Sequence, residues 1–130
     1  MIDPIWVPQD VALAYHEQQI AQHGGGAGIR DLGLLQSALA RPMNAFHYER
    51  VTSLARLAAA YGFGIAKNHP FIDGNKRTAY VVTRVFLNVN GFDIDATKEE
   101  KYLTFLTLAE GRLSEEELAV WIESKLKKVK

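Results

Sequence analysis

The sequence predicts an all-α fold, a single-domain bundle of about six helices spanning residues 1–130. Apolar residues recur every three or four positions through most of the chain, and the alternating pattern of strands is almost absent. Two capping boxes, Thr97 with Glu100 and Ser114 with Glu117, mark the starts of two helices. No repeat, low-complexity block or linker divides the chain, which is long enough for one hydrophobic core.

Glycine and proline residues delimit the first two helices. The first is expected to begin at Pro8 and to stop at the glycine run of residues 24–26. Asp31 is expected to cap the second helix. This helix should end near Arg41, because Pro42 disfavours the helical conformation of the residue before it.

The third and fourth helices are expected to flank a short loop. The third runs from about Thr52 with apolar residues at heptad spacing, and it cannot continue past His69 because Pro70 follows. The fourth begins at about residue 74, carries a broad apolar stripe, and is terminated by Gly91. This fourth helix is expected to be central in the bundle.

The last two helices follow the two capping boxes. The fifth is expected to end at Gly111, and the sixth to carry apolar residues as far as Leu126. Two short segments are candidates for extended structure: residues 92–96, which alternate, and residues 43–48.

The composition excludes several classes of function. The chain contains no Cys, so disulfides, thiolate metal sites and a Cys nucleophile are excluded. Its 15 basic residues balance its 15 acidic ones, so we expect no direct contact with nucleic acid or with an anionic membrane. There is no apolar run of about 18 residues and no leader pattern, and we expect a cytoplasmic protein. The run GGGAG follows a helix and lacks the GK(S/T) ending of a phosphate loop.

The segment NHPFIDGNKRTAY, residues 68–80, places two cations at the start of the fourth helix. Backbone N–H groups at a helix N-terminus carry partial positive charge, so Lys76 and Arg77 are each unfavourable there by roughly 0.3–1 kcal/mol. A bound anion would compensate both side chains, and the segment therefore predicts a phosphate site. The alternative is that both cations belong to a solvated helix face.

The same segment supplies further groups for phosphate chemistry. Gly74 lets the backbone approach a ligand, and the Asn75 amide can donate a hydrogen bond. Asp73 is a hard oxygen ligand of the kind that Mg²⁺ uses beside substrate phosphates, although it could serve only as a helix cap. His69 is a candidate general base, since histidine is largely neutral near pH 7, although it could serve only as a capping or packing residue at a helix end. Together these groups predict phosphoryl or nucleotidyl transfer to a hydroxyl.

The stretch HPFIDGNKRTA resembles the signature of the Fic/Doc family, H-x-F-x-D/E-G-N-G-R-x-x-R, and resembles most closely its Doc branch, which has N-K-R. The segment GGGAGIRDLGLLQSAL and the region of Pro42 are also similar to Doc-type proteins. The resemblance implies an α-helical bundle with the motif on a loop and the following helix. It also implies a role for each motif residue. His69 would be the catalytic base, and Asp73 would be a Mg²⁺ ligand. Asn75, Arg77 and the backbone amides would bind phosphates, and Phe71 would anchor the loop.

Two departures from the Fic form favour a kinase. Lys76 stands where that form has its second Gly, and Tyr80 stands where it has its last Arg. The Lys side chain should obstruct the ATP pose used for AMP transfer. The resemblance to Doc-type proteins implies inverted binding of ATP and transfer of its γ-phosphate to a protein hydroxyl, with Mg²⁺ as cofactor. Transfer of AMP or another nucleotide is the alternative.

The resemblance also implies two partners. Doc-type toxins act on a Thr of translation elongation factor Tu, and a Phd-like antitoxin, supplied as a separate chain, neutralises them. Fic proteins that restrain themselves carry a helix of the form S/T-x-x-x-E-G/N, and no Ser or Thr here has Glu four residues later. A non-catalytic module that only binds an antitoxin and regulates its own operon is the alternative from a different class.

In the family, an extended flap before the motif holds the target by strand addition. We expect this flap in residues 43–48, although an ordinary loop between helices would explain the segment equally well. The candidate flap residues are Met43, Asn44, Ala45, Phe46, His47 and Tyr48.

Overall fold

The computed structural model describes residues 3–129 and is mostly helical. Met1, Ile2 and Lys130 of the expected domain lie outside the described residues. In residues 3–129 there are six helices and one two-stranded sheet, as the sequence predicted for the fold class. Their bounds are α1 Gln9–His23, α2 Leu32–Glu49, α3 Leu54–Asn68, α4 Asn75–Val89, β1 Phe92–Ile94, α5 Lys98–Ala109, α6 Glu115–Lys125 and β2 Leu126–Lys128.

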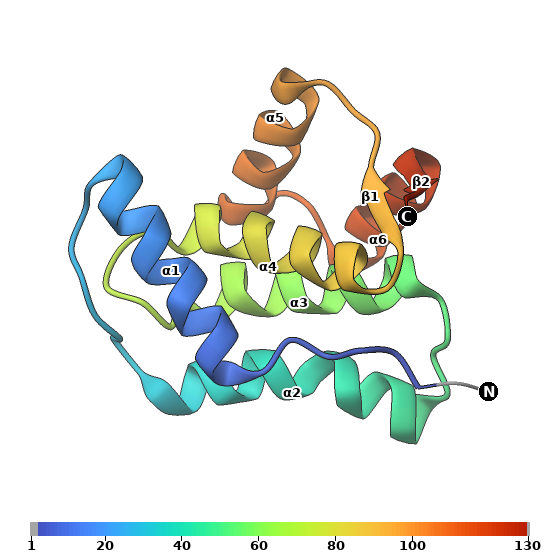
Figure 1. The fold of residues 1–130 in the computed structure, drawn as a ribbon, viewed down its shortest axis with the longest axis horizontal. Helices are drawn as coiled ribbons and strands as arrows, with labels where there is room; N and C mark the ends of the chain where they lie inside the picture. Colours follow the sequence, from blue (N-terminus) through green and yellow to red (C-terminus); the bar gives the residue numbers. More distant parts are fainter. Residues whose placement is uncertain (1–2, 130) are drawn as a thin grey trace.

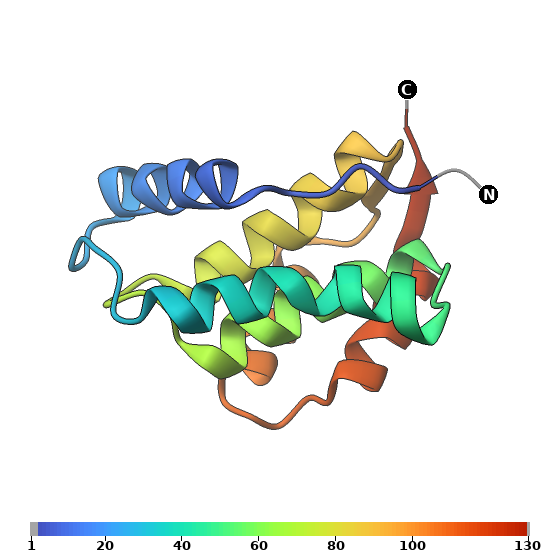
Figure 2. The ribbon, with the colours of Figure 1, turned by 90° about the horizontal axis from the view of Figure 1, so that it is seen from below.

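Helices α3 and α4 form the centre of the molecule and run antiparallel to each other (Figures 1 and 2). Helices α2, α5 and α6 pack against α3, and α1 packs against α4. The loop between α3 and α4 lies at one end of the molecule, and the described ends of the chain lie at the other (Figures 1 and 2). The predicted central position of the fourth helix is confirmed.

Side-chain caps explain where four of the helices begin. The Asp31 carboxylate accepts from the backbone N–H of Leu34 (3.0 Å), and the Ser53 hydroxyl accepts from that of Arg56 (3.2 Å). Both predicted capping boxes are present, with Thr97 and Ser114 as the capping residues. Each such cap satisfies N–H groups that a helix leaves without an internal partner.

The predicted end of the second helix is wrong. Pro42 lies inside α2, which continues to Glu49. Proline inside a helix costs roughly 3 kcal/mol in isolation, because one backbone hydrogen bond is lost and its ring crowds the preceding turn. Here Pro42 and Phe46 are both buried on the face of α2 that packs against the core, and this burial outweighs the local preference.

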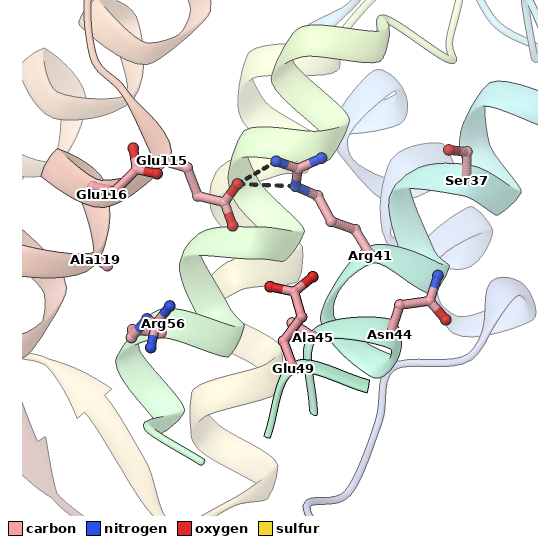
Figure 3. A pocket seen from close by; sticks show the side chains of 9 residues that line it. All are labelled: Ser37, Arg41, Asn44, Ala45, Glu49, Arg56, Glu115, Glu116 and Ala119. Carbon is pink, nitrogen blue, oxygen red and sulfur yellow. Dashed lines mark hydrogen bonds and ion pairs between the residues drawn. The ribbon is translucent and has the colours of Figure 1, made fainter. Parts of the chain in front are cut away.

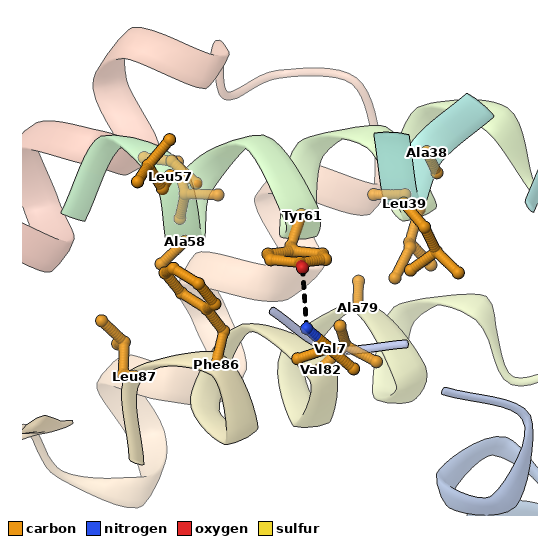
Figure 4. Close-up of a cluster of buried hydrophobic side chains, with 14 of the residues drawn as sticks. Val7, Ala38, Leu39, Leu57, Ala58, Tyr61, Ala79, Val82, Phe86 and Leu87 are labelled. Atoms are coloured by element: carbon orange, nitrogen blue, oxygen red, sulfur yellow. Dashed lines mark hydrogen bonds between the residues drawn. The ribbon is translucent and has the colours of Figure 1, made fainter. Parts of the chain in front are cut away.

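The core lies around α3, whose residues from Leu57 to Ile65 are almost all buried. Tyr61 and Phe86 are fully buried and meet with their ring centroids 5.1 Å apart. The backbone N–H of Val7 donates to the Tyr61 hydroxyl (2.9 Å), which ties the segment before α1 to the core (Figure 4). Helix α4 is therefore held in a fixed position by contacts on several sides.

A small sheet follows α4. The predicted extended segment 92–96 contains β1, which pairs antiparallel with β2. The expectation that the sixth helix includes Leu126 is wrong, because Leu126 is extended (ψ 130°) and pairs with Ile94. None of the helices in residues 3–129 has the length and apolar character needed to cross a membrane.

Candidate active site

The loop of residues 69–74 makes the turn between the two central helices. His69 ends α3 in the left-handed conformation (φ 48°), and Gly74 precedes α4 with φ 75°. The left-handed conformation is unfavourable for a residue with a Cβ, so the surrounding contacts must hold His69 there. The guanidinium of Arg30 supplies two of them, donating to the carbonyl of His69 (2.6 Å) and to that of Asn68 (2.7 Å).

Phe71 and Asn75 fix the interior side of this loop. Phe71 is 1% exposed, and the Asn75 side chain accepts from its backbone N–H (3.0 Å) and donates to its carbonyl (3.0 Å). The Asn75 amide nitrogen also lies 3.5 Å from Nδ1 of His69, at the outer limit of hydrogen bonding. Buried His16 stacks on the Phe71 ring with 3.7 Å between centroids. The loop is thus anchored from inside, while the His69 side chain is exposed.

Asp73 lies on the exposed side of the loop, with its carboxylate held by backbone groups. It accepts from the N–H of Gly74 (2.8 Å) and from that of Gly26 (3.2 Å). These two hydrogen bonds, with a smaller contribution from the positive charge of Arg77, lower the pKa of Asp73. Nε2 of His16 lies 2.8 Å from the Asp73 carbonyl and must be the donor, because a carbonyl oxygen only accepts. Asp73 is therefore a fixed, ionised carboxylate at neutral pH.

Lys76 and Arg77 lie in the first turn of α4, as predicted, and no side chain in the described part of the chain caps this turn. Within residues 3–129 no acceptor pairs with the backbone N–H of Asn75, Lys76 or Arg77. Lys76 Nζ lies 4.7 Å from the ring centroid of Tyr102, and Arg77 is exposed. Neither cation makes an ion pair in the described part of the chain. Free N–H groups and two free cations therefore share one helix end.

The predicted site residues meet around one depression, which we call the motif hollow. Its volume is about 390 Å³. It is lined by six of the predicted residues together with Ala66, Ile72 and Ala109; the six are His69, Asp73, Gly74, Asn75, Lys76 and Arg77. Phe71 does not line the hollow and is buried instead. An imidazole, a carboxylate, two cations and free N–H groups are therefore within reach of the same ligand.

The candidate flap lies elsewhere. Residues 43–48 form the last turns of α2, so the predicted extended conformation is wrong. The helix continues through them because Pro42 and Phe46 are buried against the core. The end of α2 that contains them is the end remote from the motif loop (Figures 1 and 2). These residues do not contribute to the motif hollow.

The extended segment beside the motif is the one between α1 and α2, which the sequence reasoning did not connect with the site. The N–H of Ile72 donates to the carbonyl of Gly28 (3.1 Å), and that of Arg30 donates to the carbonyl of Pro70 (2.7 Å). Ile29 and Phe71 form an antiparallel β-bridge. In the sequence, the glycine run followed by Arg30 was the signal for this segment. It could not be interpreted locally, because the segment contacts residues about 40 positions away.

A separate hollow of about 430 Å³ lies between α2, α3 and α6 (Figure 3). The guanidinium of Arg41 pairs with the carboxylate of Glu115 across it, with Nε 3.0 Å from Oε1. The motif residues do not line this hollow, and its lining contains both acidic and basic side chains. We assign it no part in the chemistry of the motif.

Comparison with known proteins places the motif in a family context. Residues 6–87 match the model of the Fic/DOC family. The protein named Toxin Doc of Mycolicibacterium smegmatis is 39% identical over 83 residues, which cover 58% of this chain and 64% of the relative, less than two thirds of its length. The protein named Protein kinase doc of Escherichia phage P1 is 34% identical over 92 residues, covering 71% of this chain and 73% of the relative.

Proposed function

The chain belongs to the Fic/DOC family, in its Doc branch, and from this premise we propose that it is a Doc-type toxin with protein kinase activity. It would transfer the γ-phosphate of ATP to a Ser or Thr hydroxyl of a translation factor, with elongation factor Tu as the expected substrate. The observation that supports this function most directly is the meeting of six motif residues around one hollow at the uncapped end of α4.

The first turn of α4 suits the phosphates of a nucleotide. Its free N–H groups point out of the helix end, and Lys76 and Arg77 add two positive charges that lack an ion-pair partner in residues 3–129. Phosphoryl transfer depends mainly on positioning and on stabilising negative charge. The side chains and backbone of this turn supply both.

His69 is the proposed general base. Its side chain is exposed at the motif hollow, and its position is fixed from the backbone by Arg30 and by the anchored Phe71. In the reaction the imidazole takes the proton of the target hydroxyl while the new O–P bond forms. The bond between the γ-phosphorus and the bridging oxygen breaks, and ADP leaves with the electron pair.

Asp73 fits a Mg²⁺ ion that is shared with substrate phosphates. Its carboxylate is ionised, and each oxygen accepts only one backbone hydrogen bond, so lone pairs are left for a metal. Mg²⁺ commonly binds one or two carboxylates together with phosphates and water. When bound it would neutralise part of the phosphate charge, and Asp73 would be its protein ligand.

Lys76 favours kinase activity over AMP transfer. Its side chain lines the motif hollow, where the Fic form of the motif has a Gly without a side chain. An ATP molecule oriented for attack at the α-phosphate would meet this side chain. A γ-phosphate placed at the same turn would gain its charge.

A Phd-like antitoxin is the proposed partner. The relative from M. smegmatis is named as a toxin, and this chain has no Ser or Thr followed by Glu at the fourth position, which a self-restraining Fic helix requires. Neutralisation would therefore come from a separate chain.

Labelled ATP tests the reaction directly. The protein is incubated with elongation factor Tu and with ATP carrying label at either the α- or the γ-position, with His69→Ala as the matched control. We expect label in the factor only from the γ-position, an increment of one phosphate by mass spectrometry, and no label with His69→Ala.

Two results would contradict this function. Label retained from the α-position identifies an AMP transferase. If cells that express His69→Ala still stop growing and the variant still binds an antitoxin, the protein is a non-catalytic regulator.

A further inference from the structure

A second depression, the basic hollow, adjoins the motif hollow. It lies between α4 and α5 beside the end of α1 and has a volume of about 580 Å³, within the usual range for small-molecule sites. Lys76 and Arg77 line both hollows, so the two are adjacent. Among residues 3–129 no Asp or Glu lines the basic hollow, and its Lys and Arg side chains are Lys76, Arg77, Arg84, Lys98 and Lys101.

The charge of this hollow is largely unneutralised. Arg84 forms a two-point ion pair with Asp93, with both N···O distances 3.0 Å. The other four cations make no ion pair within residues 3–129. Since the whole chain has equal numbers of acidic and basic residues, this concentration of positive charge is local and calls for an anion.

Aromatic rings complete the lining. Tyr102 is 57% exposed, and Lys76 Nζ lies 4.7 Å from its ring centroid. Tyr80 and Phe105 pack edge to face, with centroids 5.2 Å apart, and also line the hollow. Cations beside an accessible aromatic face form the combination that binds a phosphorylated base, because phosphates pair with the cations and bases stack on rings.

Another side of the motif hollow, lined by different residues, has a different charge. There it adjoins a third hollow of about 620 Å³, with Ala66, His69 and Ala109 common to both. The lining of this third hollow balances two basic side chains, Lys67 and Arg112, with two acidic ones, Glu110 and Glu117. His69 therefore faces a side of balanced charge, while Lys76 and Arg77 face the basic side.

This asymmetry orients the reaction. On the basis of the kinase function proposed above, we infer that the basic hollow is the subsite for the leaving nucleoside diphosphate, with Lys98 and Lys101 binding its phosphates and Tyr102 stacking on its base. In an in-line transfer the attacking and leaving oxygens lie on opposite sides of phosphorus. The hydroxyl meets His69 from the third hollow, and the bond to the bridging oxygen of ADP breaks on the side of Lys76 and Arg77.

Lys98, Lys101 and Tyr102 all belong to α5, which lies beyond residues 6–87, the part of the chain that matches the family model. The motif would therefore carry the transfer, and α5 would determine which leaving group this chain accepts. Lys98 and Tyr102 are exposed, so substitutions there should leave the fold intact.

Calorimetric titration of the full chain with ADP and with inorganic tripolyphosphate tests the subsite. We expect Lys98→Gln/Lys101→Gln to weaken both ligands by about tenfold or more. Tyr102→Leu should weaken ADP by about fivefold and tripolyphosphate by less than about twofold, because only ADP has a base to stack. Lys127→Gln/Lys128→Gln on β2 removes the same charge away from the hollow and should change neither affinity by more than about twofold.

An ADP affinity that is unchanged in the α5 variants, or reduced as much in the β2 control, overturns the assignment. Transfer of γ-label to elongation factor Tu is measured in parallel, and the α5 variants should raise KM for ATP while kcat stays within a few-fold. Normal transfer with unchanged ADP binding contradicts the subsite alone. Weakened ADP binding without any transfer by the native chain supports the nucleotide site and contradicts the kinase function.

Discussion

Gly25 is the residue whose lack of a side chain matters most for Asp73. A Cβ at position 25 would lie 2.7 Å from Asp73 Oδ2, well inside van der Waals contact. Gly24 also has a positive φ, 80° against 118° at Gly25, but a Cβ there would meet nothing within 4 Å. A side chain at position 24 would therefore introduce backbone strain alone, whereas a side chain at position 25 would also clash with the Asp73 carboxylate.

Gly25→Ala should displace the Asp73 carboxylate and lower kcat/KM for phosphate transfer by about tenfold or more. Gly24→Ala introduces similar strain without the clash, and its activity should stay within about threefold of the native value. Steady-state kinetics at several Mg²⁺ concentrations provides the measurement. Equal losses in the two variants would show that strain alone matters, and the proposed role of the Asp73 position would then be unsupported.

At the scale of elements, α3 lies close against α4 at Gly62. A Cβ there would lie 2.6 Å from Oγ1 of buried Thr83 on α4, which donates to the carbonyl of Ala79 (2.7 Å). Gly62→Ala should therefore lower the free energy of unfolding by about 1–3 kcal/mol, even though Ala favours helix by roughly 1 kcal/mol over Gly. Urea unfolding monitored by circular dichroism measures this loss.

Thr83→Ala serves as the matched partner of this substitution. It removes the obstructing oxygen, so Gly62→Ala should cost much less in the Thr83→Ala background, with a coupling of about 1 kcal/mol or more. Additive losses in the double variant would mean that the two helices are not held apart by this contact.

The Arg84–Asp93 pair joins α4 to β1 and makes stability depend on pH. Partial burial alone would raise the pKa of Asp93, but hydrogen bonds from Arg84 and from the Ile94 N–H outweigh it and lower the pKa to about 2. The contribution of the pair is therefore present above pH ~4 and is lost as the pH falls toward 2. Asp93→Asn should cost about 1 kcal/mol or less at pH 7, because Arg84 is 46% exposed and solvent screens the pair.

Urea unfolding at pH 7 and pH 3 measures this dependence. The difference between the native chain and Asp93→Asn should shrink at the lower pH, whereas exposed Asp95→Asn should show little difference at either pH. A difference that grows on acidification would contradict a stabilising role of the ionised Asp93 carboxylate.

Local signals explain which elements could be predicted from the sequence. The capping residues Thr97 and Ser114 act within four positions of themselves, and the fifth and sixth helices begin where they predict. The continuation of α2 through Pro42 depends on burial against other helices, and β2 depends on pairing with β1, which ends some 30 residues earlier. Neither can be read from a local pattern.

The candidate site divides in the same way. The motif residues all lie between positions 69 and 77, so their meeting at one helix end followed from the position of Pro70 and from the start of α4. The contacts from Gly26 and Arg30 cross 47 and 39 residues of sequence, and the stacking of His16 on Phe71 crosses 55. The sequence could predict which residues share the hollow but not the residues that hold them in place.

At the scale of the whole molecule, the segment before α1 ties three helices together. Trp6 stacks on Phe86 of α4 (centroids 5.9 Å apart) and meets Phe46 of α2 edge to face (5.6 Å). The N–H of Val7 donates to the Tyr61 hydroxyl on α3. The stability of the bundle should therefore depend on the Tyr61 hydroxyl, although Tyr61 is remote from the candidate site.

Tyr61→Phe tests this dependence, because it removes only the hydroxyl. The buried N–H of Val7 would lose its acceptor, which costs about 1–3 kcal/mol, or roughly 4 °C in Tm for each kcal/mol in a chain of this size. Tyr48→Phe removes the same group from a side chain that is 82% exposed and should leave Tm unchanged. Phosphate transfer below the melting transition should be the same in all three proteins.

The alkaline range gives an independent measurement on the same residue. Burial raises the pKa of Tyr61 to about 12, although the hydrogen bond from Val7 opposes it, and the unfolded phenol titrates near 10. The stability that the neutral phenol contributes is thus complete below pH ~10 and is lost as the pH rises toward 12. Native protein should lose stability over this range by on the order of 2 kcal/mol more than Tyr61→Phe. Parallel losses in the two proteins would mean that the Tyr61 hydroxyl is accessible to solvent and that the N-terminal segment does not seal the core.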